Sequence, residues 1–540
     1  MEESLTAALP TPTAPVEVLS VEQKRVRWMV VAACALITSA SLIQPPLHQL
    51  VAPFPPTAFN AGWTRFWNIN AGSTVALITF VLAGGVLGDL FGRRRILLIG
   101  AIGYLVMILL AVLAQNPIWF LLSSAGAGMF AALAIPMSAA VIRLTFPRDE
   151  LLWPFAAYTV CTGTAAIGAS VISGPIKYWF GWQAMFVPSI ILVCVGLVLA
   201  LRHVQETNAP YGYSPVDYVG LAAWTGVVLA LVFGLIQLQV SRLSNIVVWS
   251  SLSVAGIGAG LLIFWAMVSP GRLMRNAPFP LFALAIIILT GMTLNFATLG
   301  YAIHLFNFMR IVQQFHPVVA SVALAPLAIR LVAGGVLAGR RRGKQPHVQM
   351  IVSGLALMLI AILLTAVAVL LWRVQVAYLL LAALMVLFGA GFALASAAWQ
   401  ALYLGSMPLA LAGLSSAISS AAGQIGGVIA STVLAALIVS FGTNNFATRL
   451  DTMGLTPERV IEATAALDRA LQPEALSDPS TELGLLNTAL VAFYQESFAV
   501  AFGGVLLVSA LIIVLCATLV WFGLGPRMRQ KLARPGAQPG

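Results

Sequence analysis

The chain has 540 residues, of which 60% are hydrophobic and only 8% are charged, and its mean hydropathy is +0.97. This composition excludes a water-soluble protein, because too little polar surface remains to cover a particle of this size. The net charge of +11 would indicate a nucleic-acid partner in a soluble protein, but here the basic residues lie in short loops between apolar runs, where they report membrane topology.

Long apolar runs predict transmembrane helices along most of the chain. A spanning helix needs about 20 mostly apolar residues, and these runs lack the alternation that is typical of a membrane barrel. We therefore expect an all-α membrane protein with fourteen transmembrane helices. The predicted helices lie at about residues 28–47, 69–89, 96–115, 118–142, 152–173, 183–202, 217–237, 246–268, 280–304, 318–339, 348–371, 375–403, 410–440 and 490–523.

The loop charges predict the orientation in the membrane. Most of the 28 lysines and arginines fall on the side of the N-terminus, and an even number of helices returns the chain to that side. The positive-inside rule therefore places both termini in the cytoplasm, as a multi-pass protein of a bacterial inner membrane. Residues 1–26 are expected to be a disordered tail and residues 526–540 a basic tail. The acidic residues 441–489 form a predicted external loop, with an amphipathic helix over 456–472.

Two stretches nearly repeat each other, AGGVLGDLFGRRR at 83–95 and AGGVLAGRRRGK at 333–344. Both lie at the predicted inner end of a helix, the second and the tenth, so we infer that the chain is an internal duplication. Duplicated helical bundles are how many transporters build two halves that rock about a central site. The first copy carries Asp89 where the second carries Gly339. Asp89 and the neighbouring arginines are expected to link helix ends on the inner face.

The stretch from Gly85 to Arg95 resembles the loop between helices two and three of the major facilitator superfamily. The fourteen helices and the run PLALAGLSSAISSAAGQIGGVIA at 408–430 resemble the drug:proton antiporter branch of that superfamily, the multidrug efflux type, over about residues 24–525. The resemblance implies two pseudo-symmetric six-helix bundles, at 27–203 and 277–525, with two extra helices between them at 204–276. It also implies a conformational latch at Gly85, Asp89, Gly92, Arg93 and Arg94.

Several positions depart from this branch. The first predicted helix has no acid, Ser124 stands where helix four usually has an arginine, and Ala169 and Ser170 stand where helix five usually has a glycine-proline pair. All 17 acids fall in tails, loops or near helix ends. Proton coupling usually needs a titratable group in the membrane interior, so the resemblance implies antiport but the residues leave it open. His304 is expected to be an interfacial hydrogen-bonding residue.

The bundle arrangement predicts a central substrate cavity lined by neutral polar groups, one aromatic side chain and one charge. Each of these residues alone is also compatible with a helix-packing role. Arg330 lies close to the expected bilayer midplane, as a structural residue bonded to neighbouring polar groups or as a ligand for an anionic group; the lack of an intramembrane acid favours the ligand. The predicted cavity residues are Gln44, Ser124, Thr162, Asn295, Arg330, Trp399, Gln400 and Gln424. The two extra helices lack such residues and are expected to be peripheral.

These observations predict a transporter that moves a hydrophobic or amphipathic organic compound by alternating access, with drug-like efflux as the leading function. No nucleotide-binding loop, zinc motif or catalytic triad occurs at credible spacing, so we expect no enzyme activity, cofactor or metal. The expected partners are a small organic substrate and the lipid bilayer, with no nucleic acid, and the chain is compatible with a monomer. Two alternatives stay open: a transport-inactive relative that acts as a membrane partner or sensor, and an exporter of an anionic lipid or siderophore.

Overall fold

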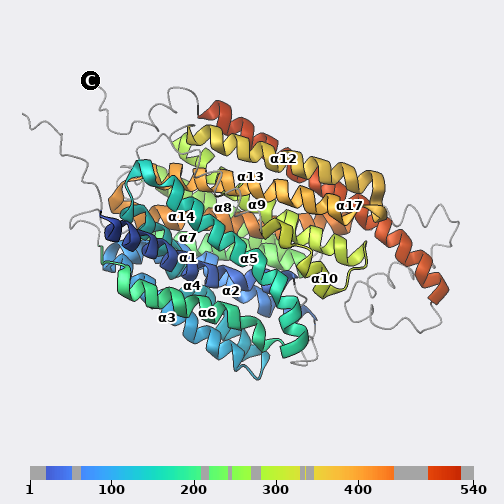
Figure 1. Cartoon of the computed structure of the whole chain (residues 1–540), viewed down its shortest axis with the longest axis horizontal. Helices are drawn as coiled ribbons and strands as arrows, with labels where there is room; N and C mark the ends of the chain where they lie inside the picture. Colours follow the sequence, from blue (N-terminus) through green and yellow to red (C-terminus); the bar gives the residue numbers. More distant parts are fainter. Residues whose placement is uncertain are drawn as a thin grey trace, which may run out of the picture.

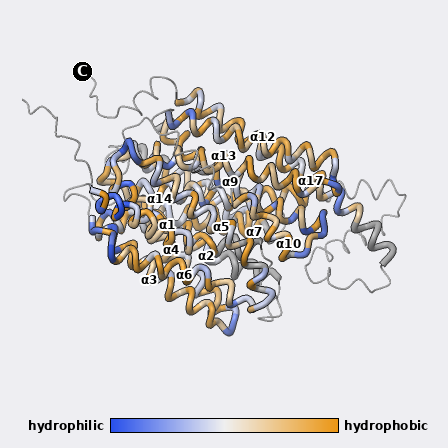
Figure 2. Tube along the Cα trace, viewed as in Figure 1, coloured by the Kyte–Doolittle hydropathy of each residue, from blue (hydrophilic) through white to orange (hydrophobic). Residues whose placement is uncertain are grey.

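The structure is a computed structural model that describes residues 20–50, 63–207, 218–240, 246–268, 281–328, 335, 346–442 and 484–524. Within these residues the chain is helical almost throughout, and eleven segments are long and apolar enough to cross a membrane. Apolar residues run along the helices, while hydrophilic residues gather at the two ends of the bundle (Figure 2). The all-α membrane fold is therefore confirmed. The predicted disordered tail 1–26 is wrong at its end, because residues 21–26 form the start of the first helix. Residues 1–19, the basic tail and most of the predicted external loop, including its amphipathic helix, lie outside the described residues.

The helices follow the order that the apolar runs predict. In the first part of the chain they are α1 (Val21–Leu50), α2 (Trp63–Phe91), α3 (Arg93–Val112), α4 (Pro117–Thr145), α5 (Leu152–Phe180), α6 (Val187–His203), α7 (Tyr218–Val240) and α8 (Ile246–Val268). In the second part they are α9 (Leu281–Ile311), α10 (Pro317–Val322), α12 (His347–Trp372), α13 (Tyr378–Ser406), α14 (Ala412–Ile429) and α17 (Gly484–Thr518). Figure 1 shows them as a bundle elongated along the helix axes.

Local sequence signals set several helix ends. The side chain of Asn116 accepts a hydrogen bond from the Trp119 amide, and Pro117 occupies the first turn of α4, where its missing N–H costs nothing. Gly92 separates α2 from α3 with a φ of 107°, a conformation that favours glycine because other residues carry a Cβ. The sharp turn between these two helices therefore depends on one residue.

Helices α1 to α6 form one bundle and helices α9 to α17 form a second. In the first, α1 packs on α5 and α6, and α3 packs on α4; in the second, α9 packs on α14 and α17, and α12 packs on α13. These are the same pairs under the expected duplication. The two bundles meet along two matching seams, one between α2 and α14 and one between α5 and α10. In Figure 1, α3 and α6 lie along one side of the molecule and α12 and α17 along the other.

Of the two extra helices, α7 lies against the seam between the bundles. It packs on α2, α14 and α8. Trp224 of α7 contacts a small apolar cluster in which Val81 of α2, Ala132 of α4 and Ala421 of α14 meet. The expectation that both extra helices are peripheral is therefore wrong for α7. Hydropathy alone could not reveal this contact, because a helix facing lipid and a helix facing an apolar seam have the same composition.

Small residues bring the helices close together inside each bundle. A Cβ at Gly354 of α12 would lie 2.6 Å from the carbonyl oxygen of Gly391 in α13, and a Cβ at Gly128 of α4 would overlap the carbonyl oxygen of Ser73 in α2. In a membrane, the hydrophobic effect does not drive helices together, because lipid tails are as apolar as the helix surfaces. Helix association therefore depends on close packing of this kind. Glycine at these two crossings therefore sets how closely the paired helices approach.

We expect Gly128→Ala to destabilise the protein by about 1 to 3 kcal/mol, because the added methyl group forces α4 and α2 apart. Thermal unfolding in detergent, followed by tryptophan fluorescence, measures this change. Gly256→Ala in α8 is the matched control, since nothing lies within 4 Å of a Cβ at that position. The control should unfold at the same or a higher temperature. Equal melting temperatures for the two variants would contradict the packing argument.

Candidate functional site

The candidate site begins at one end of the bundle, which we call the basic end. It holds the start of α1, the α2–α3 turn, the end of α4 and the linker between α13 and α14. Its arginines include Arg27, Arg93 to Arg95, Arg143 and Arg148. At this end the two bundles contact each other through polar groups as well as apolar ones.

Asp89, in the last turn of α2, binds the N-terminus of α14 in the other bundle. Its Oδ1 accepts a hydrogen bond of 2.9 Å from the amide of Gly413, and its Oδ2 accepts one of 2.9 Å from the amide of Leu414. The first amides of a helix have no partner within the helix, and they carry a partial positive charge. A carboxylate supplied by a helix that lies more than 300 residues earlier in the chain therefore caps α14.

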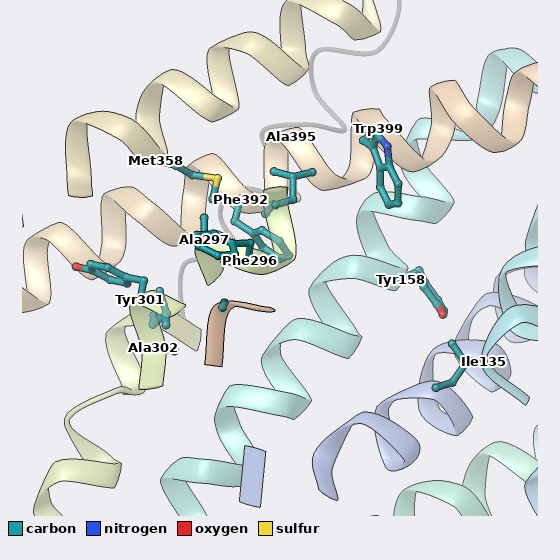
Figure 3. Close-up of a cluster of buried hydrophobic side chains, with 14 of the residues drawn as sticks. Ile135, Tyr158, Phe296, Ala297, Tyr301, Ala302, Met358, Phe392, Ala395 and Trp399 are labelled. Carbon is teal, nitrogen blue, oxygen red and sulfur yellow. The ribbon is translucent and has the colours of Figure 1, made fainter. Parts of the chain in front are cut away.

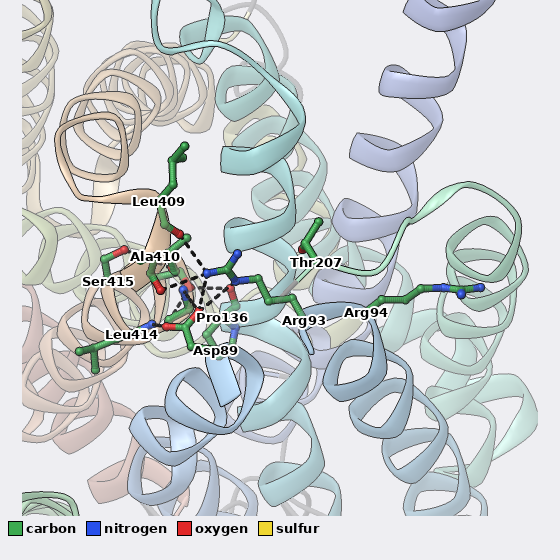
Figure 4. A network of polar contacts seen from close by, with 12 residues as sticks. Asp89, Arg93, Arg94, Pro136, Thr207, Leu409, Ala410, Leu414 and Ser415 are labelled. Carbon is green, nitrogen blue, oxygen red and sulfur yellow. Dashed lines mark hydrogen bonds and ion pairs between the residues drawn. The ribbon is translucent and has the colours of Figure 1, made fainter. Parts of the chain in front are cut away.

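Arg93, the first residue of α3, completes this contact. Its side chain is 2% exposed and forms an ion pair of 2.8 Å with Asp89. Its Nη2 also donates to the carbonyl oxygens of Leu409, at 2.9 Å, and Ala410, at 3.2 Å. Figure 4 shows Asp89 and Arg93 reaching together toward Leu409 and Ala410 of the linker and Leu414 of α14. We call Asp89, Arg93 and the backbone of residues 409–414 the latch.

Two glycines make the latch possible. A Cβ at Gly85 would lie 2.6 Å from the carbonyl oxygen of Gly413, so any larger residue would push α2 away from α14. The turn at Gly92 places Arg93 so that its guanidinium meets Asp89 four residues earlier. Arg94 is directed elsewhere: its Nη2 donates to the carbonyl oxygen of Leu201 in α6. The latch residues proposed from the sequence are thus brought together across the seam, except Arg94.

Glu206 secures the position of α3 from the side of its own bundle. Its carboxylate accepts hydrogen bonds from the amides of Arg94, at 3.0 Å, and Arg95, at 3.1 Å. The amide of Arg93 donates to the carbonyl oxygen of Thr207. The N-terminus of α3 is therefore capped by the segment that follows α6, which holds Arg93 in place for its contact with the second bundle.

A second arginine crosses the same seam. Arg143, at the end of α4, is 5% exposed. Its Nε donates to the carbonyl oxygen of Leu404 at 2.7 Å, and its Nη2 donates to that of Gly405 at 3.4 Å, both in the last turn of α13. In the sequence, Arg143 is one of the basic residues that indicate the orientation in the membrane. Its backbone acceptors carry no sequence signal, so its role appears only in the structure.

The charges of the latch match the dipoles of the helices that they bind. The C-terminal turn of α13 and the linker present carbonyl oxygens to Arg143 and Arg93, and the first turn of α14 presents amides to Asp89. Cations are favourable at helix C-termini and anions at N-termini. A further bond crosses the seam, from the hydroxyl of Ser416 to the carbonyl oxygen of Pro136, at 2.6 Å. The first bundle therefore binds both the end of α13 and the start of α14.

The predicted cavity residues of the first bundle lie on α1, α4 and α5. Ser124 is 1% exposed, and its hydroxyl has no hydrogen-bond partner among the described residues. Thr162 is 8% exposed and donates to the carbonyl oxygen of Tyr158, a bond within its own helix. Tyr158 in turn donates to Thr38 of α1. The side chain of Gln44, in α1, lies outside the described residues.

The predicted cavity residues of the second bundle have mixed roles. Trp399 of α13 donates through Nε1 to the carbonyl oxygen of Ile287 in α9, at 2.6 Å, and packs within an apolar band that Figure 3 shows together with Tyr158 of α5. Gln400 crosses between the bundles, because its Nε2 donates to Thr159 of α5 at 3.1 Å. Trp399 is thus committed to packing α13 on α9, and Gln400 to joining the bundles.

Asn295 and Gln424 are half-buried and lie on two neighbouring helices. Asn295 of α9 donates to the carbonyl oxygen of Gly291 at 3.2 Å. Its side chain lies beside Gly423 of α14, where a Cβ would come 2.8 Å from Asn295 Nδ2. Arg330, the predicted midplane charge, lies outside the described residues. The described polar residues of this region are therefore neutral.

His304 is not at the end of its helix, because α9 continues to Ile311. The side chain is 3% exposed, and its Nε2 has no hydrogen-bond partner among the described residues. Its neighbours on α9 face the second bundle: Tyr301 stacks on Phe388 of α13, and Phe308 lies against Phe502 of α17. The expected hydrogen bond of His304 is therefore not found among the described residues, and its side chain is buried inside the second bundle.

Comparison with known sequences identifies the family. Residues 29–431 match the model of the Major Facilitator Superfamily. The chain is 24% identical over 469 residues to the multidrug efflux pump LfrA of Mycolicibacterium smegmatis, covering 86% of this chain and 91% of the relative. It is 23% identical to the tetracenomycin C resistance and export protein of Streptomyces glaucescens, covering 82% of each. It is also 23% identical to the methyl viologen resistance protein SmvA of Salmonella typhimurium, covering 93% of this chain and 99% of the relative.

Solved structures show the same fold. The human organic anion transporter MFSD10 superposes with a TM-score of 0.54 at 13% identity, covering 92% of this chain and all of that one. The proton:xylose symporter XylE superposes with a TM-score of 0.53 at 14% identity, covering 91% of this chain and 94% of that one. The match over most of the chain, the paired bundles and the latch at the α2–α3 turn agree, and the chain belongs to the Major Facilitator Superfamily of membrane transporters.

Proposed function

We propose that this protein exports amphipathic, drug-like organic compounds from a bacterial cytoplasm by alternating access. In this proposal the basic end faces the cytoplasm, with both termini on that side of the inner membrane. The relatives named for multidrug efflux, for tetracenomycin C export and for methyl viologen resistance support this substrate class. The protein acts as a carrier without catalytic activity, cofactor or nucleic-acid partner, and it is compatible with a monomer.

The observation that carries the mechanism is the bond from Asp89 to the α14 amides of the opposite bundle. These hydrogen bonds and those of Arg93 exist only while the basic end is closed. A carrier that takes substrate from the cytoplasm has to open this end, so the latch must break and re-form in each cycle. Because these charged hydrogen bonds are buried, the basic end is expected to be either fully closed or open, with no stable intermediate positions.

The described polar groups between the bundles suit an amphipathic ligand. Ser124, Asn295 and Gln424 are neutral, and pockets for organic molecules combine apolar walls with a few placed polar groups. Among the described acids, Asp89 lies in the last turn of α2 and Glu496 lies near the start of the apolar span Ala492–Gly523, so neither carboxylate is placed to carry a proton at mid-membrane. Arg330 remains our proposed ligand for an anionic substrate group.

We expect Asp89→Asn to favour the state that is open at the basic end. The amide side chain loses the ion pair with Arg93 and can accept only one of the two α14 bonds, which costs about 2 kcal/mol, or roughly thirtyfold in the closed-to-open ratio. Spin-label distances between α2 and α14 at the basic end measure the populations, and a dye-efflux assay measures turnover. Asp149→Asn, an exposed acid at the same end, is the matched control. Unchanged distances in Asp89→Asn would contradict the latch.

We expect a cross-link over the α2–α14 seam to stop transport reversibly. Leu82 of α2 and Ala417 of α14 pack in one apolar cluster, so Leu82→Cys with Ala417→Cys should form a disulfide, verified by mass. In proteoliposomes the oxidised protein should lose at least about tenfold in ethidium transport and regain it on reduction, because the closed end cannot reopen. Undiminished transport by the oxidised protein would overturn alternating access at this seam; no transport in either state would favour the transport-inactive alternative.

The cysteine pair has to be introduced into a variant without native cysteines, so that the native thiols cannot form competing disulfides. In that background serine replaces the native cysteines, Cys34, Cys161, Cys194 and Cys516. Each single cysteine variant, oxidised in the same way, is the matched control and should transport normally. The same vesicles loaded with anionic and lipidic dyes distinguish a drug exporter from the exporter of an anionic lipid or siderophore.

A further inference from the structure

A pocket of about 510 Å³ opens at the basic end, on the outer side of the latch. One wall comes from the first bundle, with Arg27 of α1 and with Arg143 and Arg148 at and beyond the end of α4. The other wall comes from the second bundle, with residues 407–409 of the α13–α14 linker. The pocket therefore exists only while the two bundles are together at this end.

The charged groups that line the pocket are all cations. Arg143 is almost fully buried, and its Nε and Nη2 are held by carbonyl oxygens of α13, so its guanidinium is fixed in place. Arg27 lies over the ring of Phe146, with 5.9 Å from its Cζ to the ring centroid. Partial burial lowers the pKa of Arg148, which lies in the turn after α4, although a guanidinium stays charged at neutral pH. Three like charges around one cavity repel each other unless an anion lies between them.

We propose that this pocket binds the phosphate group of an anionic ligand, and that the inner-leaflet phospholipid headgroup is its main source. Arginine guanidinium groups match phosphate oxygens in geometry and in charge. The pocket also lies beside Trp28, which is 42% exposed and packs edge-on against Phe146 at 5.9 Å. Tryptophan at this depth is typical of the membrane–water interface, where anionic headgroups are found.

Occupancy of the pocket favours the closed latch. The linker residue Leu409 lines the pocket and also accepts the hydrogen bond from Arg93 through its carbonyl oxygen. A ligand that contacts residues 407–409 as well as the arginines loses the contacts with 407–409 when the basic end opens, so it binds the closed state more tightly. By linkage, it stabilises the closed state by the difference between its two affinities. Anionic lipid is thus a regulator of the resting conformation, separate from the transported substrate.

The test measures binding of phosphatidylglycerol to the full-length detergent-purified protein by native mass spectrometry, with melting temperature as the second readout. Arg27→Gln and Arg148→Gln are the pocket variants, because Arg143 also supports the fold. Each should weaken phosphatidylglycerol binding about fivefold, and the double variant about thirtyfold. Arg202→Gln, an exposed arginine at the end of α6, is the matched control and should bind like the unaltered protein.

Further ligands identify the source of the phosphate. Phosphatidylglycerol should raise the melting temperature of the unaltered protein, whereas phosphatidylcholine, with no net charge, should not. If inorganic phosphate gives the same increase and the pocket variants abolish it, the site is a phosphate site served by soluble anions. If the pocket variants and Arg202→Gln respond equally to phosphatidylglycerol, the proposal is overturned. Transport is not a readout here, so this outcome is independent of the proposed export function.

Discussion

The structure depends on how unpaired backbone groups at one helix corner are satisfied. Where α13 ends and α14 begins, carbonyl oxygens and amides that have no partner in their own helices face the other bundle. Asp89 takes the amides of α14, while Arg93 and Arg143 take the carbonyl oxygens of the linker and of α13. The two bundles therefore share one hydrogen-bonded corner, and separating them at the basic end exposes four kinds of polar group at once.

This corner works only because the helices around it approach closely. Gly85 faces Gly413 directly, and Gly92 turns the chain so that Arg93 follows Asp89 at ion-pair distance. The extra helix α7 covers the same seam from the side, with Trp224 against the apolar residues where α2, α4 and α14 meet. A seam that is buried and covered suits a two-state contact, because its bonds are either all formed or all lost.

The duplicated fold is symmetric, but its latch is not. The seams α2–α14 and α5–α10 are equivalent in the duplication, yet only the first hinge has an aspartate; Gly339 stands at the matching position of the second. Among the described residues, the ion pair of the latch and its bonds to α14 lie at the α2–α14 seam. The proposed phosphate pocket lies beside this same corner and shares Leu409 with the latch. In the proposal, a bound headgroup and the latch would therefore act on the same linker.

The sequence by itself determined the all-α membrane fold, the order of the helices, the duplication and the Gly85, Asp89, Gly92 and Arg93 pattern, because hydropathy and backbone conformation are local properties of a segment. Tertiary structure alone decided the partners. The sequence around Asp89 does not indicate its partner Gly413, and the sequence around Arg143 does not indicate its partner Leu404. Both partners are backbone groups more than 250 residues away, and a backbone group is present whatever the side chain is. The same reason explains why α7 at the seam and His304 inside the second bundle were not foreseen: apolar neighbours and apolar lipid leave the same pattern in the sequence.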